Sequence, residues 1–335
     1  MGFALETLGA LSVKVQTGEG VDPVPTMGLA LSGQPTYTHN DNFPEEDQLS
    51  LSAGQPAPDR EHVSQGVSAT SYIGPKQDID GEGPAVADLL RAGGCAMDVA
   101  TGAGTGPGTF VRFTPKTSGF EVSTFYGYLK EDGSGKLALL KMLDAKLNWT
   151  LTMQAALHTL QFDALAKHAF WEKFDAAAVA PANIAHGLGR FKKCTTLTIN
   201  GEAFKFVSYT LTPNHDISVP EDEPEQCGED GASEIILTPG TPGGQMVLLF
   251  DEDLIGDDPS ARNILRDSHA ADVDHEIICR YEHSGVYYQA KIPKARITTH
   301  SMGTQGNRKT LQLDYLAQPT AGNDEFELEW GYTGP

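Results

Sequence analysis

Cysteine is scarce in this 335-residue chain, and the four that occur lie far apart. Cys95, Cys194, Cys227 and Cys279 form no C-x-x-C pair, and no histidine stands beside them at the spacing of a zinc site. They therefore indicate isolated thiols in a reducing compartment. The chain also lacks an apolar run of membrane-spanning length. Its first segment, Met1–Ser12, carries no basic residue, which argues against a secretory signal.

Basic residues are few: 24 Lys and Arg stand against 45 Asp and Glu, giving a net charge of −21. A protein that grips phosphates needs clustered Lys and Arg, and no such cluster occurs. An acidic chain can still serve DNA by repelling it, so that the duplex slides past without sticking. Taken alone, the charge favours the plainer interpretation of solubility or an acidic surface suited to a salty habitat.

Sequence patterns that carry catalysis are incomplete or missing. Gly133–Lys136 is similar to the end of a phosphate-binding loop but lacks the earlier Gly, and Leu137 replaces the required Ser or Thr, which favours a hairpin turn. Asp251–Asp258 could hold Ca²⁺ but lacks the distal Glu of an EF-hand, which favours a solvated acidic turn. Asp272, Asp274, His275 and Glu276 could supply an acid and a base, but no nucleophile pattern accompanies them. We therefore expect no enzyme, no metal and no cofactor.

Short alternating segments are the main structural signal. The chain holds 36 Gly and 20 Pro, a punctuation typical of many short strands joined by turns. Apolar residues recur at every second position in 146–153, 196–199 and 325–330, and in 204–211 with one break that suggests a bulge. The sequence therefore predicts a mostly-β protein.

Helical signals are few. Ala85–Ala92 follows Pro84 and ends at a Gly pair, and Ser260–Asp267 follows Pro259, so each predicts a short helix. Leu165–Ala180 is ambiguous, with a helical linker as one interpretation.

Two long polar stretches are interpreted as loops. Ser32–Gln65 and Pro213–Ala232 are too long for ordinary connections, and loops of that length are usually functional or disordered. Their carboxylates are candidate contact residues: Asp41, Glu45, Glu46 and Asp47 in the first, and Glu221, Asp222, Glu223 and Glu225 in the second.

An internal repeat is the most informative feature. Thr159–Ala166 (TLQFDALA) and Thr310–Ala317 (TLQLDYLA) agree at six of eight positions. Two weaker matches precede them in the same order: Lys141–Leu147 with Lys291–Ile297, and 88–91 with 263–266. We therefore predict two β-domains of related fold, residues 1–180 with an N-terminal arm and residues 181–335.

Four segments resemble the major tail tube protein family of long, non-contractile bacteriophage tails. They are Thr17–Thr26, Leu89–Cys95, a stretch from Phe110–Pro115 through Gly119–Glu121 to Tyr126–Tyr128, and Gly322–Leu328. They follow one another in the family's order along most of the chain. The acidic stretch Glu221–Asp230 departs from the family pattern.

The resemblance implies tandem tail-tube-type β-sandwich domains that form a barrel, each flanked by a short helix. It implies rings whose inner strands join into one barrel. It implies that the rings stack through long loops and terminal arms, which makes the carboxylates of the two long loops candidates for contacts between rings. The resulting tube conducts DNA in the virion tail, after assembly in the host cytoplasm. The implied partners are further copies of the chain, a tape measure protein and viral DNA in the lumen without specific binding, and the tail terminator and distal tail proteins. The family has no catalytic residues, and no membrane is involved.

Ring size and lumen follow as hypotheses. The family has six tube folds per ring, so two folds per chain predict a homotrimer with pseudo-sixfold symmetry, with a homohexamer as the alternative. If Phe326, Leu328 and Trp330 pack inward, period-two geometry turns Glu325, Glu327 and Glu329 to the other face, which is either lumen or outer surface. Other virion parts, such as a tail terminator or a decoration protein, and a carbohydrate-binding or carbohydrate-cleaving β-sandwich are the alternative functions.

Overall fold

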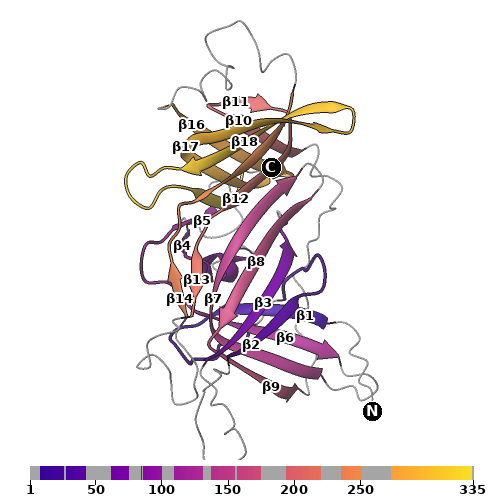
Figure 1. Ribbon diagram of the computed structural model, residues 1–335, viewed down its shortest axis with the longest axis vertical. Helices are drawn as coiled ribbons and strands as arrows, with labels where there is room; N and C mark the ends of the chain where they lie inside the picture. The colour runs from indigo at the N-terminus through magenta and orange to yellow at the C-terminus, as the bar shows by residue number, and fades with distance from the viewer. Residues whose placement is uncertain are drawn as a thin grey trace, which may run out of the picture.

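The described part of the chain folds mostly into antiparallel strands (Figure 1). The computed structural model describes residues 8–25, 28–42, 62–74, 84, 86–99, 109–130, 137–154, 157–174, 194–219, 235–250 and 273–333. Within them the predicted mostly-β class is confirmed. The single described helix, α1, has six residues and cannot cross a membrane.

The elements of the two halves follow in chain order. The first half holds β1 (Leu8–Val15), β2 (Thr36–Asn42), β3 (His62–Tyr72), α1 (Ala87–Ala92), β4 (Cys95–Val99), β5 (Phe110–Pro115), β6 (Ser123–Lys130), β7 (Leu137–Gln154), β8 (His158–Ala166) and β9 (His168–Phe174). The second half holds β10 (Thr195–Ile199), β11 (Glu202–Phe204), β12 (Phe206–Thr212), β13 (Asp216–Ser218), β14 (Ile236–Thr238), β15 (Gly243–Leu249), β16 (Asp274–His283), β17 (Val286–Gln305), β18 (Arg308–Ala317) and β19 (Glu327–Tyr332).

One long strand organises each half by running through two sheets. The first part of β7 pairs with β6 and β9, and β6 pairs with β1. The last part of β7 pairs with β8, which continues to β3 and β2. The two sheets pack face to face, since Phe125 of β6 stacks on Phe162 of β8 with ring centroids 5.8 Å apart.

The second half repeats this order of pairings around β17. The first part of β17 pairs with β16 and β19, and β16 pairs with β10. The last part of β17 pairs with β18, which continues to β15 and β12. The repeated octapeptides of the sequence are β8 and β18, which occupy the same place in the two orders. The predicted boundary at 180/181 lies outside the described residues and stays a prediction.

The two halves are joined through their strands. The end of β7 pairs with β12, so eight strands run in one order, β2-β3-β8-β7-β12-β15-β18-β17. On the other layer β19 pairs with β5, which carries β4 at its far side. Figure 1 shows β7 and β8 running diagonally beneath the strands of the second half.

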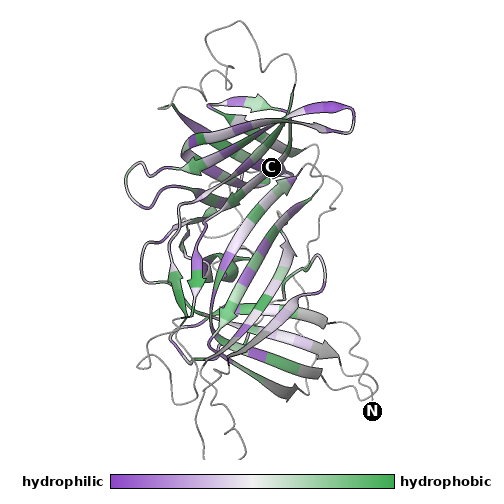
Figure 2. Cartoon of the chain, in the orientation of Figure 1, coloured by the Kyte–Doolittle hydropathy of each residue, from purple (hydrophilic) through white to green (hydrophobic). Residues whose placement is uncertain are grey.

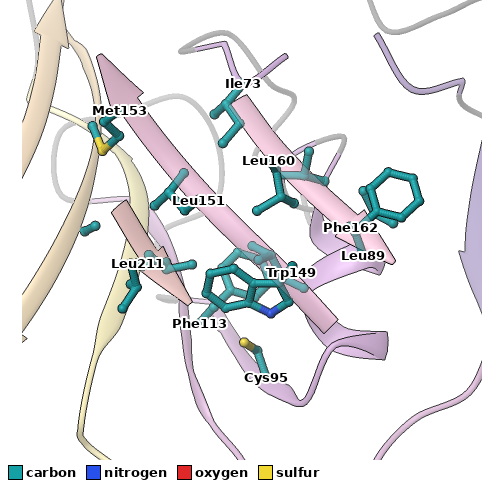
Figure 3. Packing of buried hydrophobic residues seen from close by; sticks show 14 of the residues in the cluster. Ile73, Leu89, Cys95, Phe113, Trp149, Leu151, Met153, Leu160, Phe162 and Leu211 are labelled. Carbon is teal, nitrogen blue, oxygen red and sulfur yellow. The ribbon is translucent and has the colours of Figure 1, made fainter. Parts of the chain in front are cut away.

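A continuous core of aromatic rings fills the seam between the halves. Trp149 of β7 meets Phe326 edge-on with centroids 5.7 Å apart, and Trp330 of β19 meets Phe113 of β5 at 5.6 Å. Figure 3 shows the β7 side chains of this core, with Leu211 of the second half beside Leu151. Because rings from both halves fill one space, the seam is built like a protein interior rather than like a wet domain contact.

His158, at the start of β8, is buried in this seam. Its Nδ1 is hydrogen-bonded to the hydroxyl of Tyr288, and its Nε2 lies 3.3 Å from the hydroxyl oxygen of Thr195. Tyr281 meets the imidazole edge-on at 5.9 Å. Burial lowers the pKa of His158 to about 3, so the ring is neutral at physiological pH.

Period-two patterning is confirmed where the sequence predicts it most clearly. Along β7, Leu147, Trp149, Leu151 and Met153 are buried, while the residues between them are more exposed. Figure 2 shows the resulting alternation of apolar and polar bands on β7 and β8. The predicted helix 85–92 is α1, and the break in 204–211 is a register shift at Phe206/Ser208. The hairpin turn predicted at Gly133–Lys136 lies outside the described residues, but the strands on either side of it, β6 and β7, are paired.

Three sequence interpretations are corrected. Ser32–Gln65 is not one loop, because it contains all of β2 and the start of β3, which pair with each other. Pro213–Ala232 likewise includes β13, paired with β14. The helical interpretation of Leu165–Ala180 is wrong for 168–174, which is β9. In β2 the residues Asn40, Asp41 and Asn42 have weak strand preference, so there tertiary pairing overrides local propensity. The predicted helix 260–267 lies outside the described residues.

Candidate functional site

The eight-stranded sheet presents a polar face that is built from described strands of both halves. Alternate residues point away from the core, and they form rows across the sheet because register fixes which side chains are neighbours. One row crosses seven strands through directly paired positions: Tyr72, Thr159, Thr152, Thr210, Gln245, Asp314 and Thr299. Hydroxyls and amides dominate it. The row crosses the seam between the halves without a break.

Asp314 is the charged residue of this row. Its carboxylate accepts hydrogen bonds from the Thr299 hydroxyl and from Nε2 of Gln245, the latter at 2.9 Å. These two hydrogen bonds lower the pKa of Asp314 below its ordinary value, so the group stays ionised at neutral pH. The neighbouring strands therefore hold this negative charge in a fixed position on the face.

Asp163 occupies the same place in the first half. It is the fifth residue of the octapeptide on β8, as Asp314 is on β18, and it is exposed. Ser68 of β3 and Asn148 of β7 lie directly opposite it on the two neighbouring strands. Each half thus places one aspartate on the same sheet face.

Arg296 of β17 and Arg308 of β18 are described basic residues at outward positions of these rows, and so is Lys146, near the middle of β7. Its Nζ donates a 2.7 Å hydrogen bond to the carbonyl of Ile235, so the ammonium is already engaged by the segment before β14. A polar hollow of about 270 Å³ lies at the β2 end of the sheet, between the segment Ser32–Gln34 and residues of β2, β3 and β8. Arg296 is engaged by Asp274. Among the described residues of the face, Lys146, Arg296 and Arg308 are not directly paired with one another, so they do not form a row of cations that could hold phosphates.

The three glutamates predicted for the lumen lie elsewhere. Glu327 and Glu329 are on β19, in the layer that does not belong to the eight-stranded sheet. Phe326, Leu328 and Trp330 are buried as predicted, but Glu329 is buried too, at 6% exposed. It accepts hydrogen bonds from Arg112 at 2.9 Å and from the Tyr287 hydroxyl at 2.6 Å.

Glu327 and Glu325 differ from Glu329 in their surroundings. Glu327 lies 3.7 Å from the Arg112 guanidinium, and one carboxylate oxygen of Glu325 is buried. The prediction that all three carboxylates face water is therefore wrong for Glu329. Whether any of the three faces a lumen stays a prediction.

The predicted loop carboxylates do not form a described cluster. Asp41 belongs to β2, where it is paired with Val63, and nothing further is described of its side chain. Glu45, Glu46, Asp47, Glu221, Asp222, Glu223 and Glu225 lie outside the described residues, as does the acidic turn 251–258.

The acid–base candidates on β16 have structural partners. Burial raises the pKa of Asp274, but Lys294 and Arg296 more than offset this and lower it overall. His275 is buried, with its Nδ1 3.0 Å from Nδ2 of Asn200. Within the described part of the chain, no three His, Cys, Asp or Glu side chains are grouped as a metal site would require. Cys95 and Cys279 are buried, and burial raises the pKa of both thiols.

Asp163 and Asp314 were missed as candidate site residues, although the signal was present. The repeat L-Q-[FL]-D alternates apolar and polar residues, so period two places both aspartates opposite the core. Reading the repeat for its outward positions, and not for its identity alone, would have found them. The chain was also compared with known protein families and with curated proteins, and neither comparison gave a match.

Proposed function

We propose that the chain is a virion structural protein that assembles as rings into the tube of a long phage tail. The observation that carries the proposal is the eight-stranded sheet. It crosses both halves, presents a polar face, and ends in β2 and in the last part of β17, residues 298–305, whose outer edges have no strand partner among the described residues. Such edges invite pairing with further copies, and closing the sheet removes them.

The polar face suits a conduit for DNA. Hydroxyl and amide side chains keep the wall wet without holding phosphates. Asp163 and Asp314 add negative charge, and hydrogen bonds hold the carboxylate of Asp314 in place. Duplex DNA carries about one negative charge per 1.7 Å, so an acidic wall repels it and lowers friction. The net charge of −21 is in keeping with this role.

The recurring pairings support the proposed ring of three chains. Each half contributes four strands in the same order to the eight-stranded sheet, so three chains give six such groups and pseudo-sixfold symmetry. If this sheet lines the lumen, Glu327 and Glu329 belong to the outer layer. The lumen charge then comes from the aspartates of β8 and β18.

Size and shape in solution test the proposal. The purified chain is examined by gel filtration with light scattering and by negative-stain electron microscopy. We expect trimeric rings that stack into tubes with an open channel. A chain that remains monomeric at its highest soluble concentration, with neither rings nor tubes, contradicts the proposal, and six copies per ring contradicts the trimer.

DNA binding tests the character of the wall. We expect the assembled rings to show no retention of duplex DNA at low salt, where electrostatic attraction would be strongest. Tight, salt-sensitive retention of DNA by the rings would contradict a repelling lumen.

A further inference from the structure

The seam between β7 and β12 is a complete example of how two edges of this fold join. Leu151 of β7 lies opposite Leu211 of β12, and Thr152 lies opposite Thr210, in antiparallel register. Both leucines are buried, at 3% and 0% exposed. The last four residues of β7 thus pair with residues 208–211 of β12, a strand of the other half.

The repeated octapeptide locates the counterpart of Leu151 in the second half. Leu151 is paired with Leu160, the second residue of the octapeptide on β8. The second residue of the octapeptide on β18 is Leu311, and its partner on β17 is Met302. Met302 therefore corresponds to Leu151, and Gly303 corresponds to Thr152.

The same construction locates the counterpart of β12. Thr210 of β12 is paired with Gln245 of β15, which is paired with Asp314 of β18. In the first half, Thr36 of β2 is paired with Ser68 of β3, which is paired with Asp163 of β8. Because the two aspartates are equivalent in the octapeptide, Thr36 corresponds to Thr210. Tyr37 then corresponds to Leu211.

Met302 and Tyr37 lack the strand pairing that joins Leu151 to Leu211. Met302 is 61% exposed. Among the described large apolar residues only Val24, at 63%, is more exposed. Every residue of 298–305 is exposed, and among the described residues this stretch of β17 pairs with β18 alone. The described strand partner of β2 is β3. Tyr37 packs against the core, but its hydroxyl is buried without a hydrogen-bond partner.

We propose that the end of β17 pairs with β2 of a second copy of this chain, with Met302 opposite Tyr37 and Gly303 opposite Thr36. The contact is antiparallel and head to tail, and it repeats between copies the register of the β7–β12 seam. Met302 covers Tyr37 of the next copy as Leu151 covers Leu211. The proposal rests on the proposed function for the closure of the contacts into a ring, but the edge pairing itself does not need closure.

The proposed pairing between copies differs from the β7–β12 pairing at one position. Pro35 stands where β12 has Tyr209, and proline has no N–H to donate. The ladder between copies therefore begins at Thr36 and extends toward Thr38, away from the proline. Proline just before an edge strand is tolerated, because no central ladder is interrupted.

Paired cysteines test the register. In a Cys194→Ser/Cys227→Ser background, one variant carries Thr36→Cys and Gly303→Cys, and the matched variant carries Thr36→Cys and Thr304→Cys. A short thiol-to-thiol cross-linker is added, and products are separated by denaturing electrophoresis. We expect dimer and trimer bands from the first variant and their loss in the second, because a shift of one residue turns the side chain to the opposite face. Equal cross-linking of both pairs overturns the register.

A surface variant separates this proposal from the tube. Met302→Asp should keep the thermal unfolding temperature of the monomer, since the side chain is exposed, and should lose assembly. Rings that form without cross-links at 36/303, or with Met302→Asp present, overturn the edge pairing and leave the tube intact. Cross-linked open chains without rings support the edge pairing and overturn the tube. A chain that stays monomeric and uncross-linked overturns both.

Discussion

The ends of β7 and β17 occupy the same place in two matching orders of strand pairing, yet their surroundings differ. Leu151 on β7 is 3% exposed because β12 closes its edge and core residues pack beneath it. Its counterpart on β17, Met302, is 61% exposed, and β18 is its described strand partner. The same local pattern is thus an interior in one half and a surface in the other. Burial here is decided by the neighbour and not by the strand.

A second contrast lies in the other layer. The outer edge of β19 is covered by β5, which the first half inserts between α1 and β6. The edge of β9 that corresponds to it has no strand partner among the described residues, and Phe170 on β9 is 39% exposed. The first half therefore donates an extra hairpin that seals the second, and the seam between the halves is closed on both layers.

The largest expected effect compares Leu151 with Met302 directly. Leu151→Ala should lower the free energy of unfolding by about 2–5 kcal/mol, the range for a buried leucine that leaves a cavity. Met302→Ala should change it by less than about 0.5 kcal/mol, because the side chain is already in water. Urea unfolding of the monomer, at a concentration where sedimentation shows no association, measures both. Equal losses would mean that the two strand ends have equivalent surroundings.

His158 provides the second comparison, since its counterpart at the start of β18 is the exposed Lys309. The folded-state pKa of His158 is about 3, below its ordinary 6.5, so the unfolded chain binds the proton more strongly. Stability is therefore retained above about pH 6.5 and lost as pH falls toward 3, by roughly 3 kcal/mol at pH 4.

The control for this prediction is His158→Gln, which removes the titrating group. His215, whose pKa is lowered to about 4 by burial, titrates in both proteins and cancels in the difference. Unfolding is measured by urea between pH 7 and pH 4. The wild type should lose more stability over this interval than the variant. Parallel curves would show that protonation of His158 does not strain the seam.

Much of the fold could be predicted from local pattern, and the rest could not for a physical reason. Leu147, Trp149, Leu151 and Met153 alternate cleanly, so the sequence alone identifies β7 and its buried face. Thr36–Asn42 carries Asn, Asp and His, and it becomes a strand because β3 lies beside it. A long-range partner of this kind leaves no periodic trace in the strand that it stabilises.

The candidate site divides in the same way. The repeat predicted that Thr159–Ala166 and Thr310–Ala317 are related, and their outward aspartates are on the polar face. Alternation also placed Glu329 on the face away from Phe326 and Leu328, but it could not show that Arg112 and Tyr287 cover that face. Period two tells which residues share a side of a strand, and it does not tell what packs on that side.

The third comparison tests the seam on the layer of β19. Arg112 of β5 reaches Glu329 of β19, whose side chain is 8% exposed, whereas Arg280 reaches Glu282, which is 46% exposed. Arg112→Met removes both hydrogen bonds that the guanidinium donates to this buried carboxylate and should cost at least about 1–2 kcal/mol. Glu282→Gln should cost less than about 0.5 kcal/mol, as expected for a surface pair. Thermal unfolding at low and high salt measures both, and a larger loss for Glu282→Gln would contradict the assignment of the seam.

The smallest expected effect separates the two aspartates of the polar face. Asp314 accepts hydrogen bonds from Gln245 and Thr299, which lower its pKa, whereas Asp163 is exposed opposite Ser68. Asp314→Asn should therefore cost about 1 kcal/mol at pH 7, because an amide cannot accept as strongly as a carboxylate.

The contribution of Asp314 to stability is present above its ordinary pKa and is lost as pH falls below it. Asp163→Asn should change stability by less than about 0.5 kcal/mol at any pH. Urea unfolding at pH 7 and at pH 3 distinguishes them: the gap between Asp314→Asn and wild type should narrow in acid, and a gap that widens would mean that the hydrogen bonds hold the protonated carboxyl instead.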